Sequence, residues 1–181
     1  MERSRLVFSG SGGQGVITAA IILAEAAVIY EGMNATQSQS YGAAARGGST
    51  RSDIIISSSE IHFPMVTQPN ILVTLTQEAY NRYSSIIRPG GVLLVDSRFV
   101  EHEKKVDAKH ISLPIYETVM EKIGKPIVFN ICMLGSLIGV TELVKPESIM
   151  AVLKTKVPPD YLDMNQKALD IGLELGGSFA G

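Results

Sequence analysis

Short apolar runs alternate with longer, mostly apolar stretches through the first half of this chain. Runs at 5–9, 71–75 and 92–95 are rich in Val, Ile and Leu and end at glycine or a polar residue, which predicts buried β-strands. The stretches 16–31 and 77–87 have the length and composition of helices. Because strands of this kind that alternate with helices are typical of parallel sheets, the pattern predicts a three-layer α/β/α domain with a mostly parallel sheet.

The segment between these elements is predicted to add further strands. One strand is expected at 33–37, and residues 38–49, which are small, polar and rich in glycine, are expected to form a loop. Residues 50–57 and 60–63 are both β-prone, and the two serines between them suit a tight connection. We therefore expect a β-hairpin here, which would make the sheet mixed.

The last third of the chain is predicted to be largely helical. The predicted elements are a short strand at 111–113 and helices at 114–122, 127–143, 147–156 and 161–175. The second of these helices carries no charge before Glu142 and is expected to be buried, and Asp160 is expected to cap the last helix. Residues 1–175 are thus predicted to form a single α/β domain, and the glycine-rich residues 176–181 a flexible tail.

Composition excludes several classes of protein. The chain has 181 residues, the size of one ordinary domain, and a net charge of −2, whereas a nucleic-acid-binding domain would normally carry a basic surplus. The longest uncharged run, 6–24, contains serine, threonine, glutamine and four glycines, so we expect no membrane span. The N-terminus has no signal-peptide pattern, and the expected location is therefore the cytoplasm.

Cysteine and histidine leave little scope for metal chemistry on this chain. The single cysteine, Cys132, can form neither an internal disulfide nor an iron–sulfur cluster by itself. The histidines His62, His102 and His110 have no companions at the spacing of metal ligands. We therefore expect no metal site in this chain.

Charge is distributed unevenly along the sequence. From residue 6 to residue 45 the only charged side chains are Glu25 and Glu31. Forty residues with two charges do not readily form a solvated surface. We therefore expect this part of the chain to be buried within the fold or covered by a partner protein.

A glycine-rich loop is the first candidate for a functional site. Gly10-x-Gly12-x-x-Gly15 follows a predicted strand and precedes a predicted helix, which matches the dinucleotide-binding pattern of Rossmann-like folds. However, no acidic residue follows at the position that would hold a ribose, and Val16-Ile17 stands where a phosphate-binding P-loop needs Lys-Ser/Thr. The residues Gly12, Gly13, Gln14 and Gly15 are candidates either for contact with an anionic ligand or for close packing against a neighbouring chain.

A second candidate segment lies at 39–48. Arg46, followed by Gly47, is the first basic residue after Arg5. An arginine flanked by small residues can present its guanidinium group to a phosphate or a carboxylate. The common alternative is an ordinary surface arginine in a loop.

Together these blocks resemble a known family. Gly-Ser-Gly-Gly-Gln-Gly-Val at 10–16, Gln-Ser-Tyr-Gly-Ala-Ala-Ala-Arg-Gly-Gly at 39–48 and Arg-Ser-Asp-Ile-Ile-Ile-Ser at 51–57 are similar to segments of the gamma subunit of 2-oxoacid:ferredoxin oxidoreductases. The resemblance extends over essentially the whole chain and is greatest to the 2-oxoglutarate (KorC-type) branch. It implies the fold of domain III of pyruvate-ferredoxin oxidoreductase.

The resemblance also implies a function. Complexes of this family oxidatively decarboxylate a 2-oxoacid, convert coenzyme A to an acyl-CoA, release CO2 and pass electrons to ferredoxin. Thiamine diphosphate, Mg2+ and [4Fe–4S] clusters would be held by the alpha, beta and ferredoxin-like delta subunits. The present chain would be a noncatalytic subunit of the complex, inactive alone, with Gly12, Gly13, Gln14, Gly15, Arg46 and Gly47 as candidate contacts to coenzyme A or to a partner subunit.

Two other functions stay open at this point. One is a free-standing dinucleotide-binding protein, which the missing ribose-binding acid disfavours. The other is a scaffold subunit that contacts no ligand, which the sequence alone does not separate from the coenzyme A hypothesis. In isolation, a gamma subunit is expected to be capable of forming a homodimer through the surface that its partners normally cover.

Overall fold

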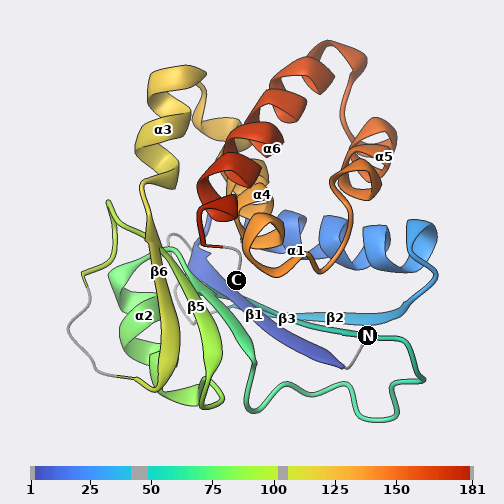
Figure 1. The fold of residues 1–181 in the computed structure, drawn as a ribbon, viewed down its shortest axis with the longest axis vertical. Helices are drawn as coiled ribbons and strands as arrows, with labels where there is room; N and C mark the ends of the chain where they lie inside the picture. The colour runs from blue at the N-terminus through green and yellow to red at the C-terminus, as the bar shows by residue number, and fades with distance from the viewer. Residues whose placement is uncertain (1–2, 42–48, 102–105, 180–181) are drawn as a thin grey trace.

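A computed structural model describes residues 3–41, 49–101 and 106–179 of the chain. Six strands form one sheet in the order β2-β3-β1-β4-β5-β6 (Figure 1). Their bounds are Ser4–Ser11 (β1), Asn34–Tyr41 (β2), Ser49–Ser57 (β3), Ile71–Thr74 (β4), Gly91–Asp96 (β5) and Ala108–Leu113 (β6). Strands β1, β4, β5 and β6 are parallel neighbours, whereas β3 runs antiparallel to both β1 and β2. The predicted mixed, mostly parallel sheet is confirmed.

The helices cover the two faces of the sheet unequally. Their bounds are Val16–Glu25 (α1), Gln77–Tyr83 (α2), Ile115–Lys122 (α3), Phe129–Thr141 (α4), Pro146–Lys156 (α5) and Leu162–Gly177 (α6). Residues of α1, α3, α4, α5 and α6 share one core with Leu6 and Phe8 of β1, whereas α2 packs against Val7 on the opposite face. The three-layer arrangement is confirmed, and α2 is the one α-helix on the second side among the described residues (Figure 1).

The expected hairpin at 50–63 is wrong. Strand β3 ends at Ser57, and its antiparallel partner is β2, which extends to Tyr41 and so includes residues expected to be a loop. An edge strand pairs through its backbone, and here the side chains of Ser38, Gln39 and Ser40 are exposed. Strand β2 therefore needs no alternation of hydrophobic and polar residues in order to pair, and the sequence of this segment shows none. This is why it was expected to be a loop.

Two helix ends also differ from the prediction. The helix expected over 16–31 consists of α1 followed by a π-helical segment, Ala26–Tyr30. Asp160 does not cap α6, because it lies in a 3-10 turn, Pro159–Tyr161, and the helix begins at Leu162 without a side-chain cap.

None of the helices in the described part of the chain is long and apolar enough to cross a membrane.

Helix α6 extends into the predicted tail because its glycines are packing residues. A Cβ atom added at Gly172 or Gly176 would overlap the backbone carbonyl oxygen of Cys132 or of Ser136 on α4. On the α4 side, a Cβ atom at Gly139 would lie 2.9 Å from the carbonyl oxygen of Leu173. The two helix backbones therefore touch directly, and the part of the tail prediction that covers 176–177 is wrong for this reason.

We expect Gly172→Ala to lower the free energy of unfolding by about 3 kcal/mol, because the added methyl group must push α4 and α6 apart. The matched control is Gly177→Ala, on the same helix, where a Cβ atom would meet nothing within 4 Å. The control should be neutral or stabilising by up to about 1 kcal/mol, since alanine is the better helix former. Urea denaturation followed by circular dichroism measures both values, and equal stability of the two variants would contradict the proposed backbone contact.

Candidate functional site

The glycine loop connects the carboxyl end of β1 to the amino end of α1. Gly13 (φ 93°) and Gly15 (φ 73°) adopt left-handed backbone conformations that residues with a side chain rarely adopt. Gly15 is the N-cap residue of α1, and it has no side chain to accept a hydrogen bond from the first turn, which also contains no acidic residue. Neither a capping side chain nor an acidic residue of the first turn therefore compensates the partial positive charge at the amino end of α1.

Gln14 holds this loop in place. Its side-chain Oε1 accepts a hydrogen bond from the backbone N–H of Ser11 (2.8 Å), and its Nε2 donates to the carbonyl oxygen of Leu75 (3.1 Å), just beyond β4. Gly10 makes room for this arrangement, because a Cβ atom there would overlap Gln14 Oε1. The fold therefore uses both ends of the Gln14 amide, which gives this residue a structural role.

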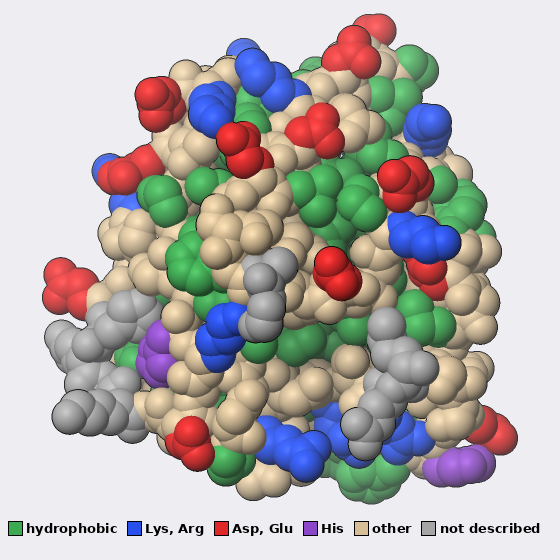
Figure 2. All heavy atoms as spheres, in the orientation of Figure 1, with side chains coloured by type: hydrophobic (Ala, Val, Ile, Leu, Met, Phe, Trp, Pro, Cys, Tyr) green, Lys and Arg blue, Asp and Glu red, His purple; other side chains and the backbone are tan. Residues whose placement is uncertain are grey.

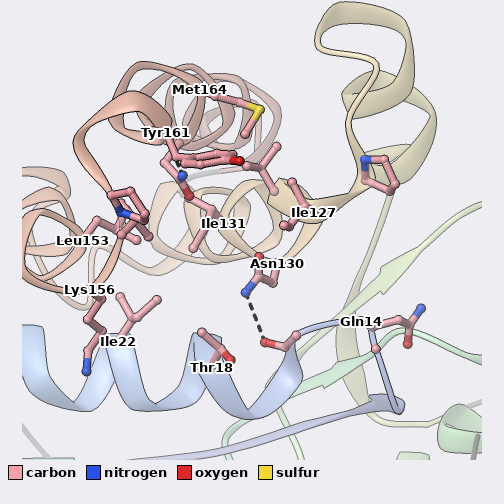
Figure 3. Close-up of a pocket in the computed structure, with 17 residues that line it drawn as sticks. Gln14, Thr18, Ile22, Ile127, Asn130, Ile131, Leu153, Lys156, Tyr161 and Met164 are labelled. Atoms are coloured by element: carbon pink, nitrogen blue, oxygen red, sulfur yellow. Dashed lines mark hydrogen bonds between the residues drawn. The ribbon is translucent and has the colours of Figure 1, made fainter.

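Asn130 supports the loop from the other side. Its Nδ2 donates to the carbonyl oxygen of Gly15 over 3.3 Å, as the dashed line in Figure 3 shows. The contact is so close that a Cβ atom at Gly15 would lie 2.6 Å from that nitrogen. Asn130 thus links the glycine loop to helix α4.

An apolar cavity of about 430 Å³ lies beside the loop. In Figure 3 side chains of α1, α4 and the segment joining α5 to α6 converge on it, with Asn130 next to the loop. Its walls include Ile22, Ile131, Leu153 and Met164, and Tyr161 lies among these residues. The cavity combines a hydrophobic wall with the amino end of a helix, which suits a ligand or a partner segment with both apolar and anionic parts.

Lys156 provides a positive charge at the edge of this cavity. Its Nζ forms an ion pair with Glu25 Oε1 at 2.9 Å, which anchors the end of α5 to the end of α1. Sequence analysis missed Lys156 and Tyr161, because they lie more than 130 residues from the glycine loop in the chain. A signal that could have pointed to this region is Asn130, a buried amide in a helix without charged residues.

The loop residues Gly12, Gly13, Gln14 and Gly15 are thus brought together at one edge of the sheet. A Cβ atom at Gly12 would meet nothing within 4 Å, so this position is open to an approaching group. Arg46 and Gly47 lie outside the described residues. The strands that flank them end at this same edge, since Tyr41 pairs with Thr50 and Ser49 pairs with Ser11.

Two buried ionisable residues, Asp96 and Cys132, have structural roles. The carboxyl group of Asp96 accepts backbone hydrogen bonds from Arg98 and Tyr116, each 2.8 Å long, and so joins the end of β5 to the start of α3. Burial raises the pKa of Asp96 against the opposing effect of these two bonds. Burial also raises the pKa of the Cys132 thiol to about 12. Cys132 is fully buried and is an unreactive core residue rather than a ligand.

The described residues do not offer a site for an iron–sulfur cluster or a resident metal ion. No group of three or more His, Cys, Asp or Glu side chains lies close enough together within 3–41, 49–101 and 106–179 to hold a metal. A [4Fe–4S] cluster is commonly held by four cysteines, and the whole chain has one.

Comparisons with known proteins agree on one family. The family model described as pyruvate ferredoxin/flavodoxin oxidoreductase matches residues 5–175. The chain is 42% identical over 175 residues to the 2-oxoglutarate synthase subunit KorC of Methanocaldococcus jannaschii, covering 96% of this chain and 94% of that protein. The keto/oxoacid ferredoxin oxidoreductase gamma subunit of Geobacter sulfurreducens is 39% identical, with a TM-score of 0.90 and complete coverage of both chains.

A third comparison concerns the fold alone. The 2-oxoglutarate:ferredoxin oxidoreductase of Magnetococcus marinus, solved with 2-oxoglutarate, coenzyme A and succinyl-CoA bound, matches with a TM-score of 0.88 at 20% identity. The match covers 98% of the present chain and 32% of that longer chain. The same domain fold therefore also occurs as one part of a larger polypeptide.

We expect Gln14→Ala to destabilise the loop by about 1–3 kcal/mol, since the Ser11 N–H and the Leu75 carbonyl would both lose their partner. Amide hydrogen exchange should accelerate at Ser11 and in the first turn of α1. The control is Gln166→Ala, because Gln166 is exposed on α6 and its side chain donates a hydrogen bond to Asp170, one turn away on the same helix. Unchanged exchange at Ser11 in the Gln14 variant would show that the amide does not hold the loop.

Proposed function

The chain belongs to the pyruvate ferredoxin/flavodoxin oxidoreductase family, as a gamma subunit of the 2-oxoacid:ferredoxin type, and we propose that the complex it serves acts on 2-oxoglutarate. The observation that carries this proposal is the 42% identity to a 2-oxoglutarate synthase subunit, which extends over nearly the full length of both chains. In this proposal the complex converts 2-oxoglutarate and coenzyme A to an acyl-CoA and CO2, and two electrons pass to ferredoxin.

The present chain contributes no catalytic residue in this proposal. Thiamine diphosphate would supply the carbon chemistry and [4Fe–4S] clusters the electron transfer, and the alpha, beta and ferredoxin-like delta subunits would hold them. The gamma chain has few groups that could ligate a cluster, since its one cysteine is buried and has a pKa raised to about 12. This supports the assignment of the clusters to the other subunits. The chain alone would be inactive.

We further propose that the glycine loop contacts a phosphate group of coenzyme A. The open position at Gly12 and the uncapped amino end of α1 would let an anionic group approach backbone N–H groups closely. Arg46 would add a guanidinium group, since it precedes Ser49 by three residues and Ser49 pairs with Ser11 next to the loop. A dinucleotide is a weaker candidate, because β2 contains no acidic residue to hold a ribose.

Partner subunits are proposed to cover the surface formed by the π-helical segment and the edge strand β2. The π-helical segment carries three exposed apolar side chains, Val28, Ile29 and Tyr30, with exposed fractions of 45%, 62% and 45%. The adjacent edge strand β2 has no charged residue. Exposed apolar side chains beside an uncharged strand are expected where another protein binds.

The substrate proposal is tested by assaying the assembled complex with 2-oxoglutarate, pyruvate and 2-oxoisovalerate, each with coenzyme A and ferredoxin. We expect kcat/KM to be at least about tenfold higher for 2-oxoglutarate, since even a difference of one methylene group in a substrate changes kcat/KM by about this factor or more. The purified gamma chain should show no activity in the same assay. A preference for another 2-oxoacid would contradict the proposed substrate and leave the family membership intact.

The coenzyme A proposal is tested in the same complex with Gly12→Val and Arg46→Ala. Each change should raise the KM for coenzyme A about tenfold, because one anion contact is blocked or lost, while the KM for the 2-oxoacid stays unchanged. The matched control is Gly177→Val, at another glycine with open space around its Cβ position. Normal assembly with an unchanged coenzyme A KM in both variants would overturn the contact.

A further inference from the structure

Three arginines surround a hollow at the opposite edge of the sheet from the glycine loop. The hollow has a volume of about 500 Å³ and is lined by Arg3, Arg5, Arg88, Ser57, Ser59 and Asn70. Arg5 lies near the start of β1, and the glycine loop follows the end of that strand. At about 3.3 Å per residue the eight-residue strand places the two regions more than about 20 Å apart.

The fold explains why this part of the sheet is open. Side chains two residues apart on a strand point to the same face, so Arg5 shares with Val7 the face that α2 covers, and Arg3 directly precedes the strand. Ser57 lies on the same face of β3, two residues beyond Ile55. Because α2 is the single helix on this side, the start of β1 and the end of β3 extend beyond its cover (Figure 1).

The positive charges in this hollow are not neutralised by the described part of the chain. Its four ion pairs involve Arg51, Arg98, Lys122 and Lys156, and neither Arg3, Arg5 nor Arg88 belongs to any of them. The residues that line the hollow include no acid. Figure 2 shows Lys and Arg side chains gathered along the lower margin of the molecule. Like charges that line one hollow repel each other, and a bound anion would relieve that repulsion.

Hydrogen bonds to neighbouring residues hold the three arginines or their backbone segments in place. Asn70 Oδ1 accepts from the backbone N–H of Arg5 (2.6 Å), and the Asn70 N–H donates to the Arg5 carbonyl (3.0 Å). The next residue back, Pro69, accepts a bond of 2.8 Å from the N–H of Arg88. Arg3 Nη2 donates to the carbonyl oxygen of Glu60 at 2.9 Å. The hollow is therefore preorganised in the fold before any ligand binds.

We propose that this arginine hollow binds a small, multiply charged oxyanion. Guanidinium groups bind phosphate and carboxylate oxygens in pairs, and the serine hydroxyls and the Asn70 amide add neutral partners. The lining residues Arg3, Arg5, Arg88, Ser57, Ser59 and Asn70 are all polar, which disfavours an apolar ligand. A phosphate ester and a di- or tricarboxylate share this chemistry, and the test separates the two sources.

The experiment titrates the full chain with pyrophosphate and, separately, with citrate at constant ionic strength, with isothermal calorimetry as the readout. Arg88→Gln removes one exposed guanidinium from a turn, and the double variant Arg5→Gln/Arg88→Gln removes two. We expect the dissociation constant of the preferred anion to rise about tenfold in the single variant and about a hundredfold in the double variant, because each charge-assisted contact contributes about a factor of ten or more.

Arg98→Gln is the matched control, because it removes an exposed arginine that already has an acidic partner, Glu117. It should leave anion binding unchanged. Binding of pyrophosphate alone would support the proposal with a phosphate ester as the ligand class, and binding of citrate alone would support it with a polycarboxylate. Absence of binding, or equal binding to the wild type and the double variant, would overturn it. Should the double variant fail to fold, Arg88→Gln keeps the test decisive, since Arg88 lies outside the strands.

Discussion

The direct contact between the backbones of α4 and α6 is the packing constraint on which the site depends. Glycines on both helices allow it: Gly135 and Gly139 on α4 face Gly172 and Gly176 on α6. Helix α4 is buried along almost all of its length, and α6 supplies much of its cover. A larger side chain at any of these positions would push α4 and α6 apart. The packing of α4 matters for the site because α4 carries Asn130 to the glycine loop.

The glycine loop is therefore supported at two points that are far apart in the sequence. Asn130 contacts it from the helix layer, and Leu75 contacts it, through Gln14, from the neighbouring strand. Both contacts leave Gly12 open, so the fold fixes the loop without filling the space in front of it. This is the arrangement expected of a binding loop: a supported backbone with open space in front of it.

Much of the fold could be predicted from the sequence, because its central strands are continuous apolar runs and its glycines separate them from helices. The edge strand β2 could not be predicted in full, since an exposed strand needs no hydrophobic pattern. The packing role of Gly176 was also missed, because glycine is common both in flexible tails and in close helix contacts, and the sequence alone does not show which of the two applies. The candidate loop was recognised, but the use of Gln14 within the fold depends on Leu75, 61 residues away, which no local pattern reveals.

The two edges of the sheet differ in the way they would attract an anion. At the carboxyl edge the positive potential comes from backbone groups at the start of α1, in a segment of the chain with almost no charged residues. At the amino edge it comes from the guanidinium groups of Arg3, Arg5 and Arg88. Backbone dipoles act over a short range and select by shape, whereas arginine side chains attract any multiply charged anion and respond strongly to salt. The uncharged strand β2 and the exposed apolar side chains of the π-helical segment can also accommodate the apolar surface of a partner, because none of these side chains carries a charge that has to be removed from water when the two proteins meet. The uneven distribution of charge along the sequence thus appears in the fold as two different ends of β1. The arginines lie at its amino end, and the charge-poor glycine loop lies at its carboxyl end.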